Sequence, residues 1–250
     1  MDVLFINPGS GKDVYQSLST DYSGIGTPYW ALLLSQSCRS QGYDVGILDI
    51  LAERLSTEQS IKRIKEINPK LITFCVYGEN VNSGTTQMSG AVRLTKALKS
   101  SGVDIPISFV GSHVQALPYQ VLNDEREIDF IFTNEGVYSL WNVLKLDDLS
   151  DKKELETIKG IGFIKDGKPF LTKPEIVVPK DRMDFDLPGY AWDLLPYKDK
   201  PLDLYRSPMW HGEYDHDKRT PYAALYTSLG CVYQCEFCMI NIINRDDNDE

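Results

Sequence analysis

Val3-Leu-Phe-Ile-Asn-Pro-Gly9 opens the chain with a short apolar run that stops at a turn signal. Four apolar residues in succession predict a buried β-strand, and the Asn-Pro-Gly that follows predicts the loop in which the strand ends. Further along the chain, short apolar runs of this kind alternate with longer segments of helical period. Such alternation is typical of a parallel sheet covered by helices on both faces.

The alternation continues through five strand-helix repeats and ends near residue 146. This size is typical of one doubly wound, Rossmann-like α/β domain, which we assign to residues 1–148. In such sheets ligands bind beyond the carboxyl ends of the strands, so the loops after the first, third, fourth and fifth strands are the informative ones. The expected strands are 3–6, 44–49, 71–76, 107–110 and 128–132, and the expected helices are 28–41, 57–67, 90–101, a short helix after Ala116, and 138–146.

A charged stretch at 145–159 marks the end of this domain. We assign residues 149–221 to a linker with a β-hairpin at 162–170, because Asp166-Gly167 lies between β-prone flanks. The rest of the linker shows no steady period, yet it is too apolar for a free tail, so we expect it to pack on a neighbouring part of the protein. Its aromatic residues include Trp192, Tyr197, Tyr205 and Trp210.

The bulk composition excludes some classes of partner. A formal net charge of -10 argues against a nucleic-acid binder and against a polybasic membrane-surface patch. No apolar run is long enough for a membrane span, and the first residues lack the features of a signal peptide. We therefore expect a cytoplasmic protein that keeps its five cysteines reduced and acts on a small molecule.

Cys231, Cys235 and Cys238 form a Cys-x3-Cys-x2-Cys run, and we expect a strand at 222–227 to lead into it. Three thiolates so close together can hold most of an iron-sulfur cluster and leave one iron with an open coordination position. An open position allows a metal centre to bind and activate a ligand, whereas a closed site is usually structural. The run therefore predicts a reactive metal centre.

The spacing of these thiols also suits two simpler roles. Spacings of four and three residues would place the cysteines on one helix face as inert buried thiols. A zinc site is the second possibility, since zinc prefers four ligands and His211 and His216 lie a short way upstream. The remaining cysteines, Cys38 and Cys75, lie in apolar surroundings and are expected to be ordinary buried thiols.

The cysteine run resembles the signature of the radical S-adenosylmethionine (SAM) superfamily, in which an aromatic residue precedes the last cysteine, as Phe237 does here. The resemblance implies that Cys231, Cys235 and Cys238 bind a 4Fe-4S cluster and are catalytic, and that the open iron binds SAM. It also implies that Phe237 packs beside the cluster and the adenine. An electron donor such as flavodoxin or ferredoxin is then expected to drive cleavage of SAM to a 5'-deoxyadenosyl radical.

The domain ahead of the run is similar to the cobalamin-binding domain of B12-dependent radical SAM proteins. Asn7-Pro8-Gly9 matches the family's loop after the first strand, and Gly26 matches the glycine that opens its first helix. Later turns match in part: Val110 replaces the first glycine of a Gly-Gly-x-His turn, and Asn134-Glu-Gly-Val137 keeps only the middle pair of Gly-Glu-Gly-Glu. The resemblance implies cobalamin contacts from Asn7, Pro8, Gly9, Gly26, Cys75, Tyr77, Gly78, Gly111, Ser112, His113, Asn134, Glu135 and Gly136.

Cobalamin domains of the mutase type carry Asp-x-His-x-x-Gly after the first strand, and its histidine binds cobalt. That motif is absent here, and residues 9–27 contain no histidine. We therefore expect cobalamin to bind without a histidine ligand from this loop. Tyr15 and Tyr22 are candidates for packing against its lower face, although surface or core positions suit tyrosines equally.

Together these resemblances imply a cobalamin-dependent radical SAM enzyme. Methyl transfer to an unactivated centre of a small-molecule substrate is the leading hypothesis. A cyclase or rearrangement enzyme that uses cobalamin without net methylation, and a non-enzymatic corrinoid-binding module, are the alternatives. We expect residues 222–250 to be the start of a radical SAM (β/α) barrel that is truncated here, so that the 250-residue piece is inactive by itself.

Overall fold

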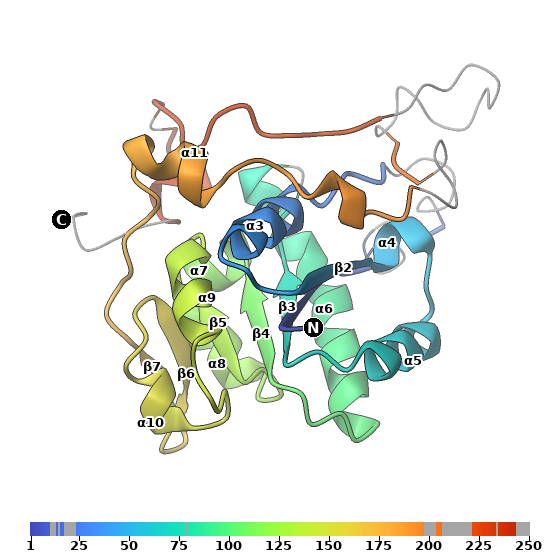
Figure 1. Ribbon diagram of the computed structural model, residues 1–250, viewed down its shortest axis with the longest axis vertical. Coiled ribbons are helices and arrows are strands. Elements are labelled where there is room, and N and C mark those ends of the chain that lie inside the picture. Colours follow the sequence, from blue (N-terminus) through green and yellow to red (C-terminus); the bar gives the residue numbers. More distant parts are fainter. Residues whose placement is uncertain are drawn as a thin grey trace.

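A seven-stranded sheet with the order β2-β1-β3-β4-β5-β6-β7 forms the centre of the computed structural model (Figure 1). Strands β1 to β5 run parallel, and β6 and β7 continue the sheet in antiparallel pairing. This parallel order is that of flavodoxin-like doubly wound domains, so the predicted α/β fold class is confirmed. The structure describes residues 1–10, 14, 16–17, 24–78, 80–197, 204–206, 222–233 and 235–243.

The strands and helices follow one another in the expected alternation. In the part of the chain that the structure describes, no helix combines the length and apolarity needed to cross a membrane. The strands are β1 Val3–Asn7, β2 Val45–Asp49, β3 Leu71–Cys75, β4 Ile107–Val110, β5 Phe130–Phe132, β6 Ile161–Lys165 and β7 Lys168–Leu171. The helices are α3 Tyr29–Ser40, α4 Ile50–Glu53, α5 Thr57–Ile67, α6 Thr85–Ser100, α7 Ser112–Ala116, α8 Pro118–Asp124, α9 Val137–Val143, α10 Lys152–Leu155 and α11 Met183–Asp186, with the short 3-10 turns η1 Val81–Ser83, η2 Lys180–Arg182, η3 Trp192–Leu194 and η5 Met239–Asn241.

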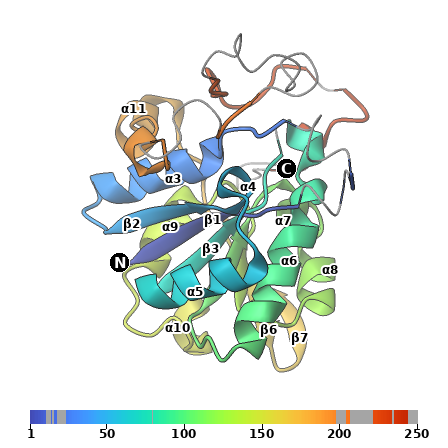
Figure 2. The ribbon, with the colours of Figure 1, turned by 90° about the vertical axis from the view of Figure 1, so that its right-hand side faces the viewer.

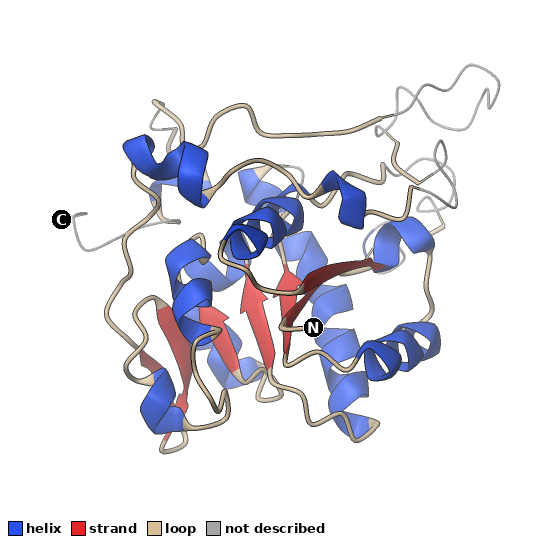
Figure 3. Cartoon of the chain, viewed as in Figure 1, coloured by secondary structure: helices blue, strands red, loops and turns tan. Residues whose placement is uncertain are grey.

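Helices cover both faces of the sheet (Figures 2 and 3). Val3 and Phe5 of β1 belong to the core beneath α3 and α9, while Leu4 and Ile6 belong to the core beneath α5, α6, α7 and α8. Because successive side chains of a strand point to opposite faces, a continuous apolar run supplies both cores at once. This explains why β1 is apolar throughout.

Helix α6 differs most from its predicted bounds, and α9 ends at Val143, three residues before its predicted end. Helix α6 begins at Thr85 and passes through Gly90, which we expected to start it. At that point the helix lies against the loop after β1: a Cβ on Gly90 would lie 2.6 Å from Ser10 Oγ. Gly90 therefore allows the helix and the loop after β1 to approach closely, and it does not mark a helix end. Helix α7, directly after β4, was not predicted.

The hairpin at the expected position is confirmed, with Asp166 and Gly167 at positive φ in its turn. We assigned it to the linker, but β6 pairs with β5 and makes the hairpin part of the sheet. Without that pairing β5 would present an unpaired backbone edge. Ile161 and Phe163 are buried in the core next to α9. How the chain divides into domains stays a prediction.

The predicted strand at 222–227 is wrong, because this segment pairs with no strand among the described residues. Side-chain hydroxyls bind its backbone instead. Thr27 Oγ1 donates to the carbonyl of Ala224 at 2.6 Å and accepts from its N–H at 2.8 Å. Tyr190 does the same for Tyr226, at 3.0 and 2.9 Å. The N–H and carbonyl groups of Ala224 and Tyr226 thus have hydrogen-bond partners without belonging to a sheet.

The linker packs on the outer side of α3, as its aromatic content predicted, and Figure 1 shows the segment that contains α11 lying across this helix. Leu195, Leu204 and Tyr205 are buried in a cluster with Ile25, Leu32 and Ala52, and Trp192 and Tyr197 pack at its edge. Trp210, His211 and His216 lie outside the described residues.

Asp49, at the end of β2, anchors the linker from inside the protein. Its carboxylate accepts hydrogen bonds from Asn7 Nδ2 at 2.8 Å, the Tyr205 hydroxyl at 2.7 Å and the Ala52 N–H at 3.1 Å. The side chain is fully buried, and burial raises its pKa to about 6 although the three hydrogen bonds oppose this shift. The linker is therefore attached to a carboxylate that binds a proton more readily than usual.

This shift predicts a pH dependence of stability. Between about pH 4 and pH 6 the native state holds the Asp49 proton more tightly than the unfolded chain, so the free energy of unfolding should fall as the pH rises and then level off. An Asp49→Asn side chain stays neutral and should gain ~2 kcal/mol relative to the native chain across this window. Urea unfolding at a series of pH values measures the difference. Asp104→Asn, at an exposed aspartate, is the control, and parallel pH curves for Asp49→Asn and the native chain would contradict the prediction.

Candidate functional site

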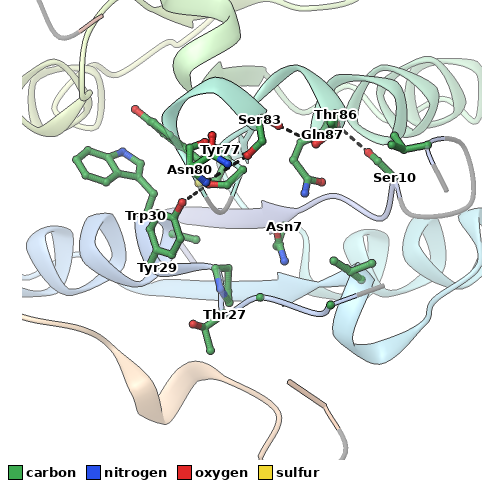
Figure 4. A pocket seen from close by; sticks show the side chains of 18 residues that line it. Asn7, Ser10, Thr27, Tyr29, Trp30, Tyr77, Asn80, Ser83, Thr86 and Gln87 are labelled. Carbon is green, nitrogen blue, oxygen red and sulfur yellow. Dashed lines mark hydrogen bonds between the residues drawn. The ribbon is translucent and has the colours of Figure 1, made fainter. Parts of the chain in front are cut away.

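A cavity of about 190 Å³ lies at the carboxyl ends of β1 and β3 (Figure 4). The chain leaves β1 toward β2 on one side, while β3 lies on the other side of β1. In doubly wound sheets the loops part at such a switch point and ligands bind there. The position of the cavity therefore matches the predicted binding edge.

Five of the predicted cofactor contacts line this cavity: Asn7, Gly26, Cys75, Tyr77 and Gly78. Cys75 is also buried, as is Cys38, and burial raises the pKa of both thiols. These two cysteines are thus the buried, protonated thiols that the sequence predicted. Contact between the five lining residues and a cofactor stays a prediction.

The predicted residues after β4 lie elsewhere. Gly111 has φ +156, and a Cβ there would lie 2.3 Å from the Val76 carbonyl oxygen, so glycine lets β3 and β4 end side by side. Ser112 is fully buried. His113 lines a second cavity of about 210 Å³ between α6 and α8, where its Nδ1 lies 2.9 Å from Thr85 Oγ1 and burial lowers its pKa.

The predicted residues after β5 have structural partners. Asn134 Oδ1 accepts from the Gly136 N–H at 3.0 Å, and its Nδ2 donates to the Glu175 carbonyl at 2.8 Å. Glu135 Oε1 accepts from the Val178 N–H at 2.5 Å. These contacts hold the start of the linker against the domain. Neither side chain lines the first cavity, and Pro8 and Gly9 do not line it either.

The cavity wall mixes polar and apolar side chains and carries no charge, since no charged side chain lines it among the described residues. Tyr29 donates its hydroxyl hydrogen to the Gly78 carbonyl. Burial raises the pKa of Tyr77, so that phenol stays neutral. Gln87 Oε1 is buried without a hydrogen-bond partner in the described part of the chain. A buried acceptor of this kind is expected to be satisfied by a ligand or water, so the wall suits a neutral ligand with amide or hydroxyl donors.

Sequence reasoning missed several lining residues. Ser10, Thr27, Tyr29 and Gln87 were not among the candidates, although each lines the cavity. Gln87 was missed because the helix was expected to begin at Gly90, which left the first turn of α6 in a loop. The polar residues that follow β3 were the available signal. Tyr15 and Tyr22 lie outside the described residues.

The cysteine run is not assembled into a metal site. Cys231 and Cys235 are exposed and Cys238 is half-buried. Within the ranges that the structure describes, no three His, Cys, Asp or Glu side chains lie close enough together to hold a metal ion. Phe237 is 83% exposed, so the described part of the chain does not shield it. Three thiols are a suitable donor set for an iron-sulfur cluster, but their present arrangement does not enclose one.

Both flanks of the run are attached to loops that wall the cavity. Upstream, the Tyr226 hydroxyl donates to the Tyr29 hydroxyl at 2.8 Å, and the two rings meet edge to face with centroids 4.2 Å apart. Downstream, the Met239 N–H donates to Asn82 Oδ1 at 2.9 Å, in the loop after β3. The tertiary structure therefore attaches the segments on both sides of the three cysteines to loops that wall the cavity, which the sequence could not show.

Two relatives of this chain are methyltransferases by name. An uncharacterized methyltransferase of Pyrococcus horikoshii is 24% identical over 238 residues, which cover 95% of this chain and 45% of the relative. Cytidylyl-2-hydroxyethylphosphonate methyltransferase of Streptomyces wedmorensis is 25% identical over 270 residues, which cover 94% of this chain and 47% of the relative. The chain spans about half the length of these relatives.

Among solved structures, the radical S-adenosylmethionine methyltransferase TsrM of Kitasatospora setae has a similar fold, with a TM-score of 0.50 and 16% identity over 69% of this chain and 30% of that chain. At this identity the likeness shows the fold alone. The model of the B12 binding domain matches residues 16–144. This match covers more than half of the chain. It includes the loop after β3, which lines the first cavity, and the loop after β4, which leads to the second cavity. The chain therefore belongs to the B12-binding domain family.

Proposed function

We propose that the protein is a cobalamin-dependent radical SAM enzyme that transfers a methyl group to an unactivated centre of a small molecule. The observation that carries the proposal is the attachment of both flanks of the cysteine run to the cavity loops, through Tyr226 and Met239. These contacts support the proposal that the B12-binding domain works together with a radical SAM cluster at the cysteine run. The names of the two methyltransferase relatives support the type of reaction.

The cavity residues fit a cobalamin in their chemistry. The edge of the corrin ring carries neutral amide side chains, which have both N–H donors and carbonyl acceptors. Asn7 and Gln87 offer amides to such groups. The hydroxyl hydrogens of Thr27 and Tyr29 already bind backbone carbonyls, so toward a ligand these oxygens can only accept. The cavity is smaller than a whole cobalamin, so these residues would hold one part of it at the switch point of the sheet.

Each bound group would supply a distinct chemistry: cobalamin a transferable methyl group, and SAM on a cluster held by Cys231, Cys235 and Cys238 a radical. The chain's residues would bind and orient these groups. They would also exclude water, which needs a more enclosed arrangement than the exposed cysteines now have. Phe237 is proposed to cover the cluster and adenine, and an electron donor such as flavodoxin or ferredoxin is proposed as a partner.

Among the described residues, nothing assigns a histidine ligand to cobalt. Residues 9–27 contain no histidine, and His113 lies at the second cavity, between α6 and α8. We therefore propose that other residue types of this chain meet the lower face of the corrin. A cobalamin-dependent cyclase or rearrangement enzyme would use the same residues.

A corrinoid-binding module without cluster chemistry is the second candidate. The exposure of Cys231 and Cys235 favours this candidate, since cysteines that bind no cluster do not need to be enclosed. Iron binding separates the two candidates.

Anaerobic reconstitution with iron and sulfide tests the cluster. The protein is expected to take up about four irons, and Cys235→Ala should lose most of them, because a thiolate ligand is removed. Iron and sulfide content, with the visible absorption, is the measurement. Cys38→Ala, which removes a buried thiol far from the run in sequence, should keep the iron. Stoichiometric zinc with no iron uptake would contradict the proposal.

Replacement of Gln87 tests the cavity. Gln87→Met removes a buried acceptor that lacks a partner, so the protein without corrinoid should become ~1 kcal/mol more stable. The same change removes an acceptor for corrinoid amides, and hydroxocobalamin should bind about tenfold more weakly. Urea unfolding and equilibrium dialysis measure the two effects. Gln36→Met, on α3 and outside the cavity, should leave the affinity unchanged. Equal affinity in Gln87→Met and the native chain would show that this carbonyl meets no ligand.

A further inference from the structure

Residues 24–29 lead from the first loop to the first residue of α3, and we call this segment the wall. Both the cavity and the C-terminal part of the chain contact it. Gly24, Gly26, Thr27 and Tyr29 line the cavity. The same short segment also binds the C-terminal part of the chain. A ligand in the cavity and the approach to the cysteine run therefore contact one stretch of backbone.

The contacts to the C-terminal part come from alternate residues of this wall. The backbone of Ile25 exchanges two hydrogen bonds with Arg206, at 2.9 and 3.0 Å. Thr27 Oγ1 binds both backbone groups of Ala224. The Tyr29 hydroxyl accepts from the Tyr226 hydroxyl at 2.8 Å. Ile25 lies in an isolated β-bridge with Arg206 and Tyr29 is the first residue of α3, so these contacts extend along the wall as far as the helix.

The wall has little freedom to change without moving its partners. Ile25, Thr27 and Tyr29 are 3%, 3% and 6% exposed. Tyr29 is bound at both ends of a hydrogen-bond chain: its hydroxyl receives from Tyr226 and donates to the Gly78 carbonyl on the opposite side of the cavity. A close-packed interior transmits a displacement to its neighbours because it holds few voids. Only four residues separate Tyr226 from Cys231.

We propose that the wall at 24–29 couples occupancy of the cavity to the position of the cysteine run, with Tyr226 as the positioning residue that makes the connection. The proposal rests on the proposed function for the identity of the ligand, a corrinoid. A ligand that packs against Thr27 and Tyr29 fixes the hydroxyls that hold Ala224 and Tyr226, and so fixes the backbone that leads to Cys231. By linkage, ordering the run must strengthen corrinoid binding by the same factor.

Two variants break this connection without changing the cavity lining. Tyr226→Phe keeps the ring that packs on Tyr29 and removes only the hydroxyl. Tyr190→Phe removes the hydroxyl that binds the backbone of Tyr226. Tyr43→Phe is the matched control, because it removes a hydroxyl that binds the Trp141 carbonyl and touches neither the cavity nor the run.

The rate at which iodoacetamide alkylates Cys231 and Cys235 reports the position of the run, since both thiols are exposed. Rates are measured by mass spectrometry on the iron-free protein, with and without saturating cyanocobalamin. We expect cyanocobalamin to slow alkylation about fivefold in the native chain and in Tyr43→Phe, and by no more than about twofold in Tyr226→Phe and Tyr190→Phe. Cyanocobalamin should also bind more weakly to these two variants. Unfolding midpoints confirm that each variant is folded.

The outcomes separate this inference from the proposed function. If cyanocobalamin binds but leaves the alkylation rate unchanged, the coupling is overturned and corrinoid binding stands. If it slows alkylation equally in Tyr226→Phe and the native chain, the ligand shields the thiols directly and the coupling is again overturned. If the native chain binds no cyanocobalamin, both proposals fail.

Discussion

Burial of α3 on two sides is the constraint on which the rest of the structure depends. Nine of its residues are buried. Trp30, Leu33 and Leu34 pack against the sheet, while Leu32 packs outward on Leu195, Leu204 and Tyr205 of the linker. The first half of α3 is apolar all round, and such a segment must be covered on every side. The linker is therefore a layer of the fold, and it carries the cysteine run back across the cavity.

The cavity follows from the same arrangement. On one side the cavity is lined by the loop after β3 and the start of α6. On the other side it is lined by the wall at 24–29. The linker and the segment that leads to the cysteine run hold that wall from outside, through Arg206 and Ala224. Gln87 Oε1 keeps an unsatisfied acceptor there. A buried acceptor of this kind is expected to meet a ligand or an ordered water.

Sequence reasoning succeeded where local chemistry decides the structure. Helix α5 has its predicted bounds, and local chemistry accounts for them, since Ser56 and Gln59 form a capping box and Asn68 ends the helix. The hairpin was predicted from Asp166-Gly167. Reasoning failed where a distant contact decides: Gly90 lies within α6 because the loop after β1 packs there, and residues 222–227 form no strand because Thr27 and Tyr190 bind their backbone.

The sequence by itself determined the doubly wound sheet and singled out the three thiols as candidate cluster ligands, because apolar periodicity and residue spacing are local properties. Only the tertiary structure decided which candidates share a cavity. In the structure Asn7, Tyr77 and Gly78 line one cavity and His113 lines another. Glu135 accepts a hydrogen bond from the backbone of Val178. The physical reason is that burial and hydrogen bonding depend on neighbours far apart in the chain, such as Tyr29 and Tyr226, which no local pattern records.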